Sequence, residues 1–422
     1  MLRRDLIRTA ALAGTSVWAL GRHALAAVGP AADGTAAPRR LVVVFMRGAV
    51  DGLNLVVPYA DGEYARYRPT IALGRPGSDG GVLDLDGHFG LHPALSPLMP
   101  WWRSGHLGFV QACGSPDTTR SHFDAQDYME SGTPGRKSTA DGWMNRLLGA
   151  LPGPHENAPT RGVSVGPVLP RIYAGPQPVA NLASGAAAAK PTVLDRPRVG
   201  SAFDSLYAGN DAMARAYQAS RQAHREVMGS LQGEDLEREM AAANNGAPLP
   251  NGFPDDAARL ARLMRNDARV QLAFMAVGGW DTHANQGAAT GQLANRLQPL
   301  GQGLAALAQG LGPVFDDTVV LVMSEFGRTA HQNGNGGTDH GHGNVLWALG
   351  GPVAGGRVHG HWPGLDQGAL YEGRDLAVST DFRSVITQVA LQHLQMPEDR
   401  MAALLPDFRE PAGLPALRLL RA

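Results

Sequence analysis

The sequence predicts an α/β fold built on a mostly parallel central sheet. Two stretches, Leu41–Met46 and Thr318–Met323, are apolar or β-branched throughout and too short for helices, which is typical of strands buried on both faces. Helical patterns lie between these and other strand-like runs. The chain also contains 54 glycines and 30 prolines, so much of the remainder is expected to form loops.

The elements are justified in chain order by their apolar pattern and their boundaries. Strands are expected at 41–46, 107–111, 162–170, 269–277 and 318–323. Helices are expected at 94–104, 121–131, 140–151, 201–244, 254–268, 286–311 and 381–394. Asp381 is expected to cap the last helix, because its carboxylate can accept from backbone N–H groups there. We interpret 180–255, with its interspersed charges, as a helical insertion or lid that shapes access to the site.

Residues 1–26 have the features of a twin-arginine signal peptide. Arg3 and Arg4 precede an apolar run at 10–20, and Ala24-Leu25-Ala26 provides a small-x-small cleavage site. The apolar run is too short to span a bilayer, so no stable membrane insertion is expected after cleavage. The expected partner is the twin-arginine export machinery, and the expected location is periplasmic or secreted. A flexible segment at 27–38 then leads into a single domain at 39–422.

Charge and cysteine content limit the possible functions. The whole chain has a formal net charge of −1, and the signal peptide holds four arginines against one aspartate, so the mature chain is more acidic. This balance argues against a nucleic-acid partner. Cys113 is the only cysteine, so no internal disulfide is possible. It is expected to be a small buried residue at a strand end rather than a reactive thiol.

The strand at 318–323 ends abruptly in polar residues that suit an active centre. Ser324, Glu325 and Arg328 follow it directly, and a loop rich in Asn and Gly then brings Asp339, His340 and His342. In open α/β sheets, ligands bind beyond the carboxyl ends of the strands, so we expect the active centre here. The alternative is that Glu325 and Arg328 form an ion pair and that the histidines have no chemical role.

Two other expected strands end in residues that can bind a metal. Asp51 lies between glycines just after 41–46, although Asp-Gly is also a common turn dipeptide. Asp281 and His283 follow the strand at 269–277. Their spacing of two lets both side chains point the same way in an extended segment and hold one cation.

The segment after the strand at 107–111 combines hydroxyl groups with the start of a helix. Thr119 or Ser121 can cap that helix, with Asp124 in its first turn. A hydroxyl here can also act as a nucleophile, since free backbone N–H groups and the helix dipole favour an anionic ester in front of it. The two roles are compatible.

Together these residues predict a metal-dependent hydrolase of phosphate or sulfate esters, exported from the cytoplasm. The substrate is a small-molecule or polymer ester, and the cofactor is one or two divalent ions, with histidine ligands favouring zinc, manganese or iron over magnesium or calcium. The alternative is a non-catalytic exported binding or cell-surface protein with a degenerate metal site. The metal-ligand candidates are Asp51, Asp281, His283, Glu325, Asp339, His340 and His342. The catalytic candidates are Thr118, Ser121, His122 and Arg328.

The motifs RGAVDGLN, TRSHFDAQDYMESG, GWDTH, SEFGRT and DHGHGN resemble a family of bacterial twin-arginine-exported proteins, domain of unknown function 1501, over nearly the whole mature chain. That family is similar to the alkaline phosphatase and sulfatase superfamily. The resemblance implies an alkaline phosphatase-like sheet between helices, with two metals at the strand ends. It assigns Asp51, Asp281, His283, Glu325 and either His340 or His342 as ligands, and it favours Thr118 over Ser121 as nucleophile.

The chain departs from the superfamily pattern at three points. An Asp-x-His spacing at Asp281 and His283 replaces the usual Asp-x-x-x-His. Glu325-Phe326 stands where the superfamily has Asp-His, which removes one imidazole ligand. The sulfatase Cys/Ser-x-Pro-x-Arg signature is absent, although Arg120 remains available for an anionic group. These departures imply that one metal site is altered or empty.

Overall fold

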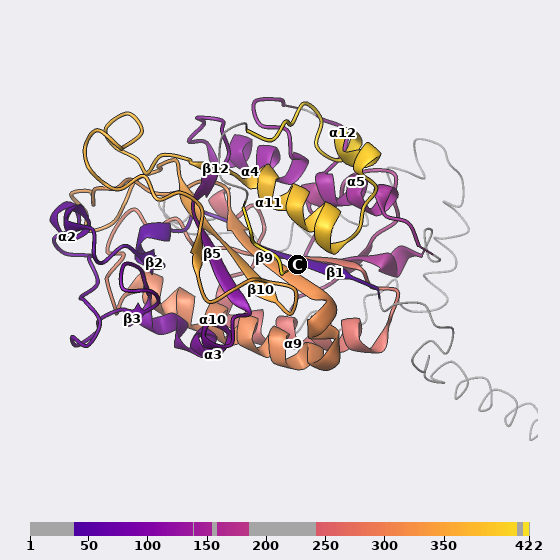
Figure 1. Cartoon of the computed structure of the whole chain (residues 1–422), viewed down its shortest axis with the longest axis horizontal. Coiled ribbons are helices and arrows are strands. Elements are labelled where there is room, and N and C mark those ends of the chain that lie inside the picture. Colours follow the sequence, from indigo (N-terminus) through magenta and orange to yellow (C-terminus); the bar gives the residue numbers. More distant parts are fainter. Residues whose placement is uncertain (1–37, 138, 154–157, 185–241, 412–416, 422) are drawn as a thin grey trace, which may run out of the picture.

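The computed structural model describes residues 38–137, 139–153, 158–184, 242–411 and 417–421 (Figure 1). The predicted signal peptide, almost all of the segment 27–38 and most of the predicted insertion lie outside the described residues. At the edge of that insertion, Ala180–Leu182 forms a strand of the main sheet.

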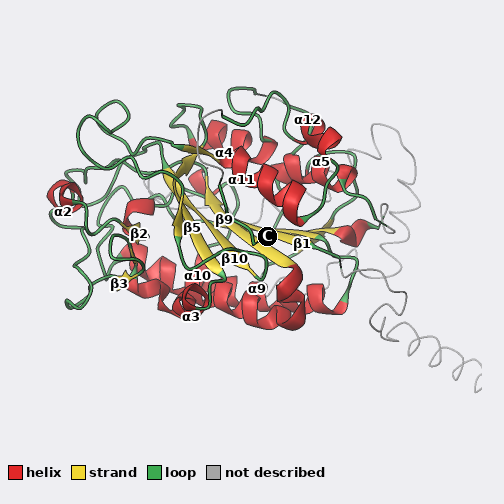
Figure 2. Cartoon of the chain, viewed as in Figure 1, coloured by secondary structure: helices red, strands yellow, loops and turns green. Residues whose placement is uncertain are grey.

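A nine-stranded sheet forms the centre of the described part (Figure 2). Its order is β11-β5-β10-β9-β1-β8-β6-β7, with β12 paired to β5. All of these strands run in one direction except β10, which is antiparallel to both β5 and β9. The strands are β1 Arg40–Met46, β5 Leu107–Gly114, β6 Gly162–Val165, β7 Ala180–Leu182, β8 Leu272–Val277, β9 Thr318–Ser324, β10 Asn344–Gly350, β11 Val358–His359 and β12 Thr380–Asp381. The predicted mostly parallel sheet is confirmed.

Helices cover both faces of this sheet (Figure 1). One layer contains α3 Met99–Arg103, α9 Phe253–Asn266 and α10 Gln292–Leu311. The other contains α4 His122–Ser131, α5 Trp143–Ala150, α11 Phe382–Gln388 and α12 Met401–Leu404. Outside both layers are α2 Gly62–Tyr67 and a small antiparallel sheet of β2 Val56–Val57, β3 Leu83–Asp84 and β4 Gly90–Leu91. None of the helices in the described ranges is long and apolar enough to cross a membrane.

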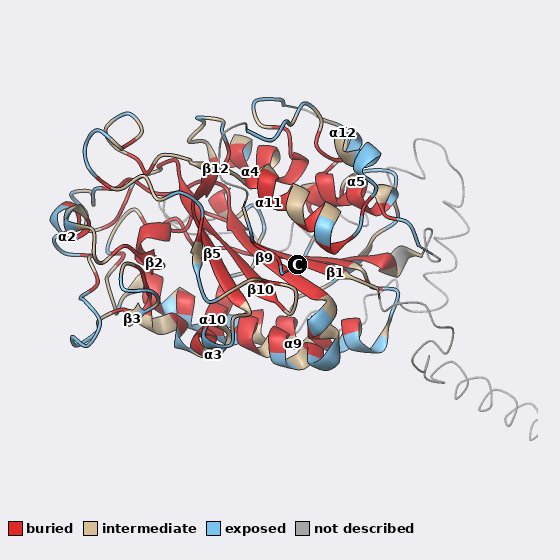
Figure 3. Ribbon diagram, viewed as in Figure 1, coloured by how far each residue is buried: buried red, intermediate tan, exposed pale blue. Residues whose placement is uncertain are grey.

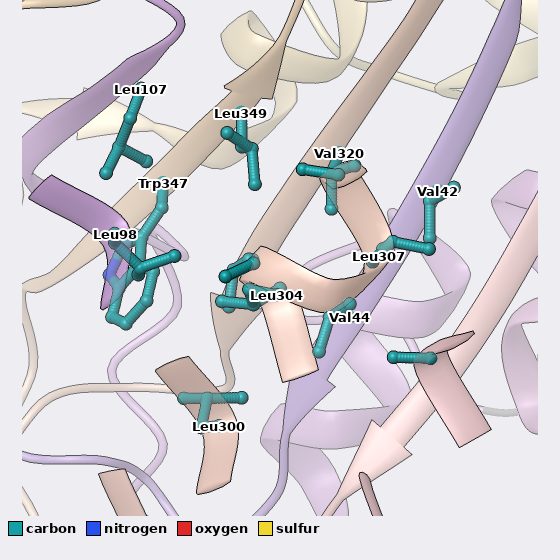
Figure 4. Close-up of a cluster of buried hydrophobic side chains, with 14 of the residues drawn as sticks. Val42, Val44, Leu98, Leu107, Leu300, Leu304, Leu307, Val320, Trp347 and Leu349 are labelled. Carbon is teal, nitrogen blue, oxygen red and sulfur yellow. The ribbon is translucent and has the colours of Figure 1, made fainter. Parts of the chain in front are cut away.

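Strand β1 shows why the central strands are apolar throughout. Val42 and Val44 pack against the α9–α10 layer, whereas Val43 and Phe45 pack against the α5–α11 layer. Alternate residues of a strand point to opposite faces, so a strand between two helical layers needs apolar residues at every position. Figure 4 shows Val42 and Val44 among the side chains of the first cluster, and Figure 3 shows the central strands buried along their length.

Most of the expected elements are present, but several have shifted boundaries. The strand expected at 162–170 covers Gly162–Val165, and the helix expected at 286–311 covers Gln292–Leu311. Nearly all of the helix expected at 201–244 lies outside the described residues. Strand β10 was not predicted, and it is the antiparallel strand of the central sheet. The predicted helix at 381–394 is α-helical only to Gln388 and continues as a π-helical turn at Val389–His393. Asp381 caps α11 as predicted, since its carboxylate accepts from the Arg383 N–H. Cys113 is buried in β5, and burial raises the pKa of its thiol.

Candidate metal centre

The chemically reactive side chains gather at one edge of the central sheet. Strands β5, β9, β1 and β8 run in the same direction and end at Gly114, Ser324, Met46 and Val277, so the loops that follow them begin at the same edge. Strand β10 runs the other way and begins here, at Asn344. Segments distant in sequence therefore meet where open α/β sheets bind their ligands.

The carboxylate of Asp281 is the centre of a cluster of three imidazole rings. Its Oδ1 lies 3.0 Å from His283 Nε2 and 3.4 Å from His340 Nε2, and its Oδ2 lies 3.6 Å from His122 Nε2. His340 Nε2 is also 3.0 Å from the Nε2 atoms of both other rings. We call these four residues the three-histidine cluster.

Each ring of the three-histidine cluster is held from behind by an acceptor at Nδ1. Glu325 Oε1 lies 2.8 Å from His122 Nδ1, Asp339 Oδ1 lies 3.2 Å from His283 Nδ1, and the Arg120 carbonyl lies 2.8 Å from His340 Nδ1. A ring that donates from Nδ1 carries its lone pair on Nε2. Carboxylates and carbonyls of this kind typically orient histidines that bind a metal through the other nitrogen.

The cluster meets the donor requirements of a divalent cation. Three Nε2 atoms lie within 3.6 Å of the Asp281 carboxylate oxygens, an arrangement in which unprotonated donors repel one another unless a cation or protons lie between them. One nitrogen or oxygen from each of His122, Asp281 and His340 lies within 4.8 Å of the others. Mixed imidazole and carboxylate donors suit zinc, manganese or iron.

The ionisation of the cluster shows how strongly it attracts positive charge. Burial opposes the ionised form of Asp281, but hydrogen bonds from His122, His283 and His340 hold the pKa of this carboxyl far below its usual range. Burial also disfavours protonated His122, but hydrogen bonds with Asp281 and Glu325 outweigh it and raise the pKa of His122 to about 9. A raised pKa favours the protonated form of His122, so a cation that binds through its Nε2 would have to displace a proton.

Arg328 is fixed inside the protein beside Asp281. Its guanidinium donates to the Asp281 carboxylate, to the Ala49 carbonyl at 2.5 Å and to the Gly48 carbonyl at 2.7 Å, and its side chain is fully buried. These hydrogen bonds use the donors of Arg328 inside the protein, where its guanidinium acts as the counter-ion of Asp281. The ion pair considered between Glu325 and Arg328 is therefore replaced by a pair between Asp281 and Arg328.

Glu325 faces His122 and a set of donors. Its Oε1 accepts from the Gly48 N–H at 2.8 Å and from Gln126 Nε2 at 3.0 Å, in addition to His122. Gly48 has a φ of +114°, and a Cβ there would lie 2.8 Å from the Asp281 backbone nitrogen. Only glycine lets the loop after β1 approach the cluster this closely. The carboxylate of Glu325 thus holds a ring and does not face the Nε2 atoms.

Asp51 lies in a separate buried network. Its Oδ2 accepts from Arg68 at 2.6 Å and from Gln286 Nε2 at 2.6 Å. Its Oδ1 is buried without a hydrogen-bond partner among the described residues. Within the described part of the chain, these contacts do not join Asp51 to the three-histidine cluster.

The remaining predicted residues lie around the cluster without joining its centre. The ring of His342 packs on Tyr371, with centroids 4.6 Å apart. Ser121 caps α4 by accepting from the Asp124 N–H, as predicted. Thr118 is exposed, and no contact in the described part of the chain joins it to the cluster.

The structure adds two groups that sequence reasoning missed. The backbone carbonyl of Arg120 and the side chain of Gln126 both contact the histidine–carboxylate network. A backbone carbonyl has no sequence signal. Gln126 lies one helical turn after His122, a spacing that places both on one face of α4 and that a search for partners of His122 can use.

Comparison with known proteins identifies the family. A family model described as Protein of unknown function (DUF1501) matches residues 38–396. No curated protein sequence matches the chain.

Solved structures similar to the chain include Ps i-CgsB in complex with k-i-k-neocarrahexaose, at 10% identity and TM-score 0.37 over 86% of this chain and 74% of that one. They include the C-terminal periplasmic domain of EcEptC from Escherichia coli in complex with Zn, at 10% identity and TM-score 0.35 over 75% and 74%. They also include the PsFucS1 sulfatase from Pseudoalteromonas sp., at 11% identity and TM-score 0.35 over 86% and 68%. Such TM-scores carry no argument about the reaction. The family match alone is decisive: the chain belongs to the family described as Protein of unknown function (DUF1501).

Proposed function

We propose that this protein is an exported metal-dependent hydrolase of phosphate or sulfate esters that holds one divalent ion in the three-histidine cluster. The observation that supports this most strongly is the orientation of the three rings. Each directs Nε2 toward Asp281 while Nδ1 is anchored by Glu325, Asp339 or the Arg120 carbonyl. Histidines that bind a metal typically donate their other ring N–H to a carboxylate or a carbonyl in this way.

The division of charge supports a single ion. Arg68 and Gln286 both donate to Asp51 Oδ2, which lowers the negative charge that this carboxylate offers to a second metal. Asp281 is balanced in part by Arg328, which keeps the negative charge at the site low enough for an anionic ester to approach. We therefore assign Glu325 and Asp339 as orienting groups, and Asp51 and Arg328 as parts of buried ion pairs.

Two rings of the cluster are partly exposed, whereas its carboxylate is buried. The side chains of His283 and His340 are 28% and 24% exposed, whereas that of Asp281 is 3% exposed. A divalent metal supplies Lewis acidity, which polarises an ester oxygen and makes water a stronger acid. The partly exposed rings of His283 and His340 thus form the side on which an ester can bind.

The attacking group remains a choice between water and Thr118. Ser121 is engaged as the cap of α4, whereas the Thr118 hydroxyl is exposed on the loop that leads to His122. The export signal at Arg3 and Arg4 supports a periplasmic or secreted location.

The test is an assay of ester hydrolysis with controlled metal content. The chelator-treated protein is reloaded with zinc, manganese, iron, magnesium or calcium and offered a phosphate monoester, a phosphate diester and a sulfate ester of 4-nitrophenol. The proposal predicts that one of these metals restores turnover of at least one ester. His340→Ala should abolish that turnover, and His342→Ala, two residues away, is the matched control.

A non-catalytic exported protein is the second candidate. The Asp51–Arg68 pair supports it, because it leaves a single metal where ester hydrolases of the resembled type use two. Metal-loaded protein that binds one ion tightly and hydrolyses none of the three esters would favour this alternative.

A further inference from the structure

A cavity lies at the same edge of the sheet as the three-histidine cluster. It has a volume of about 230 Å³ and is bounded by the carboxyl ends of β6 and β8, the loop 166–171 and the loop 245–248. Its floor is formed by Ser164 and Phe274, which are paired in register, and by Ala276. We call it the two-arginine pocket, because Arg47 and Arg171 line its walls.

Both arginines carry a buried donor without a partner. Arg47 is 4% exposed; it donates to the Asn245 carbonyl at 2.8 Å and to Glu130 at 2.5 Å, but its Nε has no hydrogen-bond partner in the described part of the chain. Arg171 donates to Asp127 and Thr139, and its NH1 atom likewise has no partner there. Buried guanidinium donors left unpaired are unfavourable, and two of them belong to residues that line the same cavity.

The chemistry of the pocket defines the class of acceptor. Guanidinium groups bind planar or tetrahedral oxyanions best, through charge-assisted hydrogen bonds. The apolar part of the lining, with Phe274 and several prolines, suits a compact carbon skeleton that carries such a group. Arg47 and Arg171 each have a carboxylate partner, so the pocket offers directed donors rather than a large excess of positive charge.

The pocket shares a wall with the three-histidine cluster. Asn245 lines the pocket and donates through Nδ2 to Gln126 at 3.2 Å. Gln126 donates in turn to Glu325 at 3.0 Å, and Glu325 faces His122. A short chain of hydrogen bonds thus joins the pocket to the cluster and makes them neighbours at this edge of the sheet.

We propose that the two-arginine pocket binds a second oxyanion group of the substrate, a carboxylate, sulfate or phosphate, and so selects substrates that carry two such groups. The assignment to the substrate rests on the proposed ester hydrolysis. The anion-binding property of the pocket does not depend on it.

The binding test uses inorganic sulfate and inorganic phosphate on the chelator-treated full chain, followed by calorimetry at constant ionic strength. Two variants probe the pocket: Arg171→Met removes the donors, and Ala276→Leu fills the cavity without touching either arginine. Arg383→Met is the matched control, because Arg383 also pairs with an aspartate but lies on α11. We expect saturable binding in the wild type and the control, and binding at least tenfold weaker in both pocket variants. Absence of saturable binding, or equal binding in all four proteins, would overturn the proposal whether or not the protein is an enzyme.

A kinetic experiment distinguishes an oxyanion that is part of the substrate from a separate free anion. With an ester substrate that carries a second oxyanion, Arg171→Met should raise KM at least tenfold with little change in kcat, and free sulfate should compete with this substrate. Binding of free sulfate without any effect on KM would show that the pocket serves a separate anion and would reject its assignment to the substrate.

Discussion

The Nε2 atoms of His122 and His340 lie 3.0 Å apart, although the two residues are separated by 218 positions in the chain. Both rings have an acceptor at Nδ1, so in the neutral form that donates there each ring carries a lone pair on Nε2. Two such lone pairs at this distance repel unless a proton or a cation lies between them. This relationship is the geometric basis of the proposed metal centre.

Glu325→Gln should weaken metal binding by about 10- to 100-fold, the usual effect of removing an orienting partner from a metal-bound histidine. The variant keeps the shape of the side chain but removes the carboxylate that faces His122 Nδ1. Competition with a chelator measures the change. Glu372→Gln is the control, since Glu372 is an exposed carboxylate paired with Arg120. Equal metal affinity in both variants would remove Glu325 from the orienting role.

Asp281→Ala and His283→Ala should differ in stability although both lose metal. His283 is partly exposed, so its removal should cost less than about 1 kcal/mol in the metal-free protein. Removal of Asp281 leaves the buried guanidinium of Arg328 without its counter-ion, which should cost about 3 kcal/mol or more. Urea unfolding of the chelator-treated proteins measures both values. An Asp281→Ala variant as stable as His283→Ala would contradict the buried ion pair.

Thr118→Ala and Ser121→Ala separate the two hydroxyls. If Thr118 attacks the ester, its removal abolishes turnover and leaves metal content and Tm unchanged. Ser121→Ala removes the cap of α4 and should cost about 0.5 to 2 kcal/mol of stability with turnover retained. Full activity of Thr118→Ala would assign the attack to water, and a folded but inactive Ser121→Ala would exchange the two roles.

His92 should make stability depend on pH. Burial lowers the pKa of His92 to about 4, whereas the ring titrates near 6.5 when the chain is unfolded. Between these values the unfolded state binds more protons, so the free energy of unfolding falls as the pH falls, by up to roughly 1.4 kcal/mol per pH unit. His92→Asn, which can still cap the segment that begins at Pro93, should flatten the slope between pH 4 and 6.5. An unchanged slope would contradict this contribution.

The sequence was sufficient for two of the strands that are apolar throughout and for the polar residues that follow them. Leu41–Met46 and Thr318–Met323 correspond to β1 and β9, because burial on both faces leaves a continuous apolar run. Strand β10, Asn344–Gly350, has the same character, but nothing in such a run specifies direction or neighbours. Its antiparallel direction depends on its pairing with both β5 and β9 in the folded sheet.

The three-histidine cluster could be predicted only in part, because contacts between side chains from distant segments have no signal in the sequence. Asp281 and His283 lie in one loop, so their proximity could be inferred from spacing. The pairing of Asp51 with Arg68 could not be inferred from spacing. Arg68 reaches Asp51 from the end of α2 and offsets the charge that suggested a metal ligand. Between His340 and His342, the choice depends on the Arg120 carbonyl, which fixes the ring of His340, while His342 turns to Tyr371.

The central claim is that one divalent ion is held by His122, His283, His340 and Asp281. The most direct measurement is the metal content per chain of the wild type, His340→Ala and His342→Ala after equilibration with limiting free zinc or manganese. The account predicts one ion per chain in the wild type and in His342→Ala, and a large loss in His340→Ala. One full equivalent in His340→Ala, or equal loss in the two variants, would contradict it.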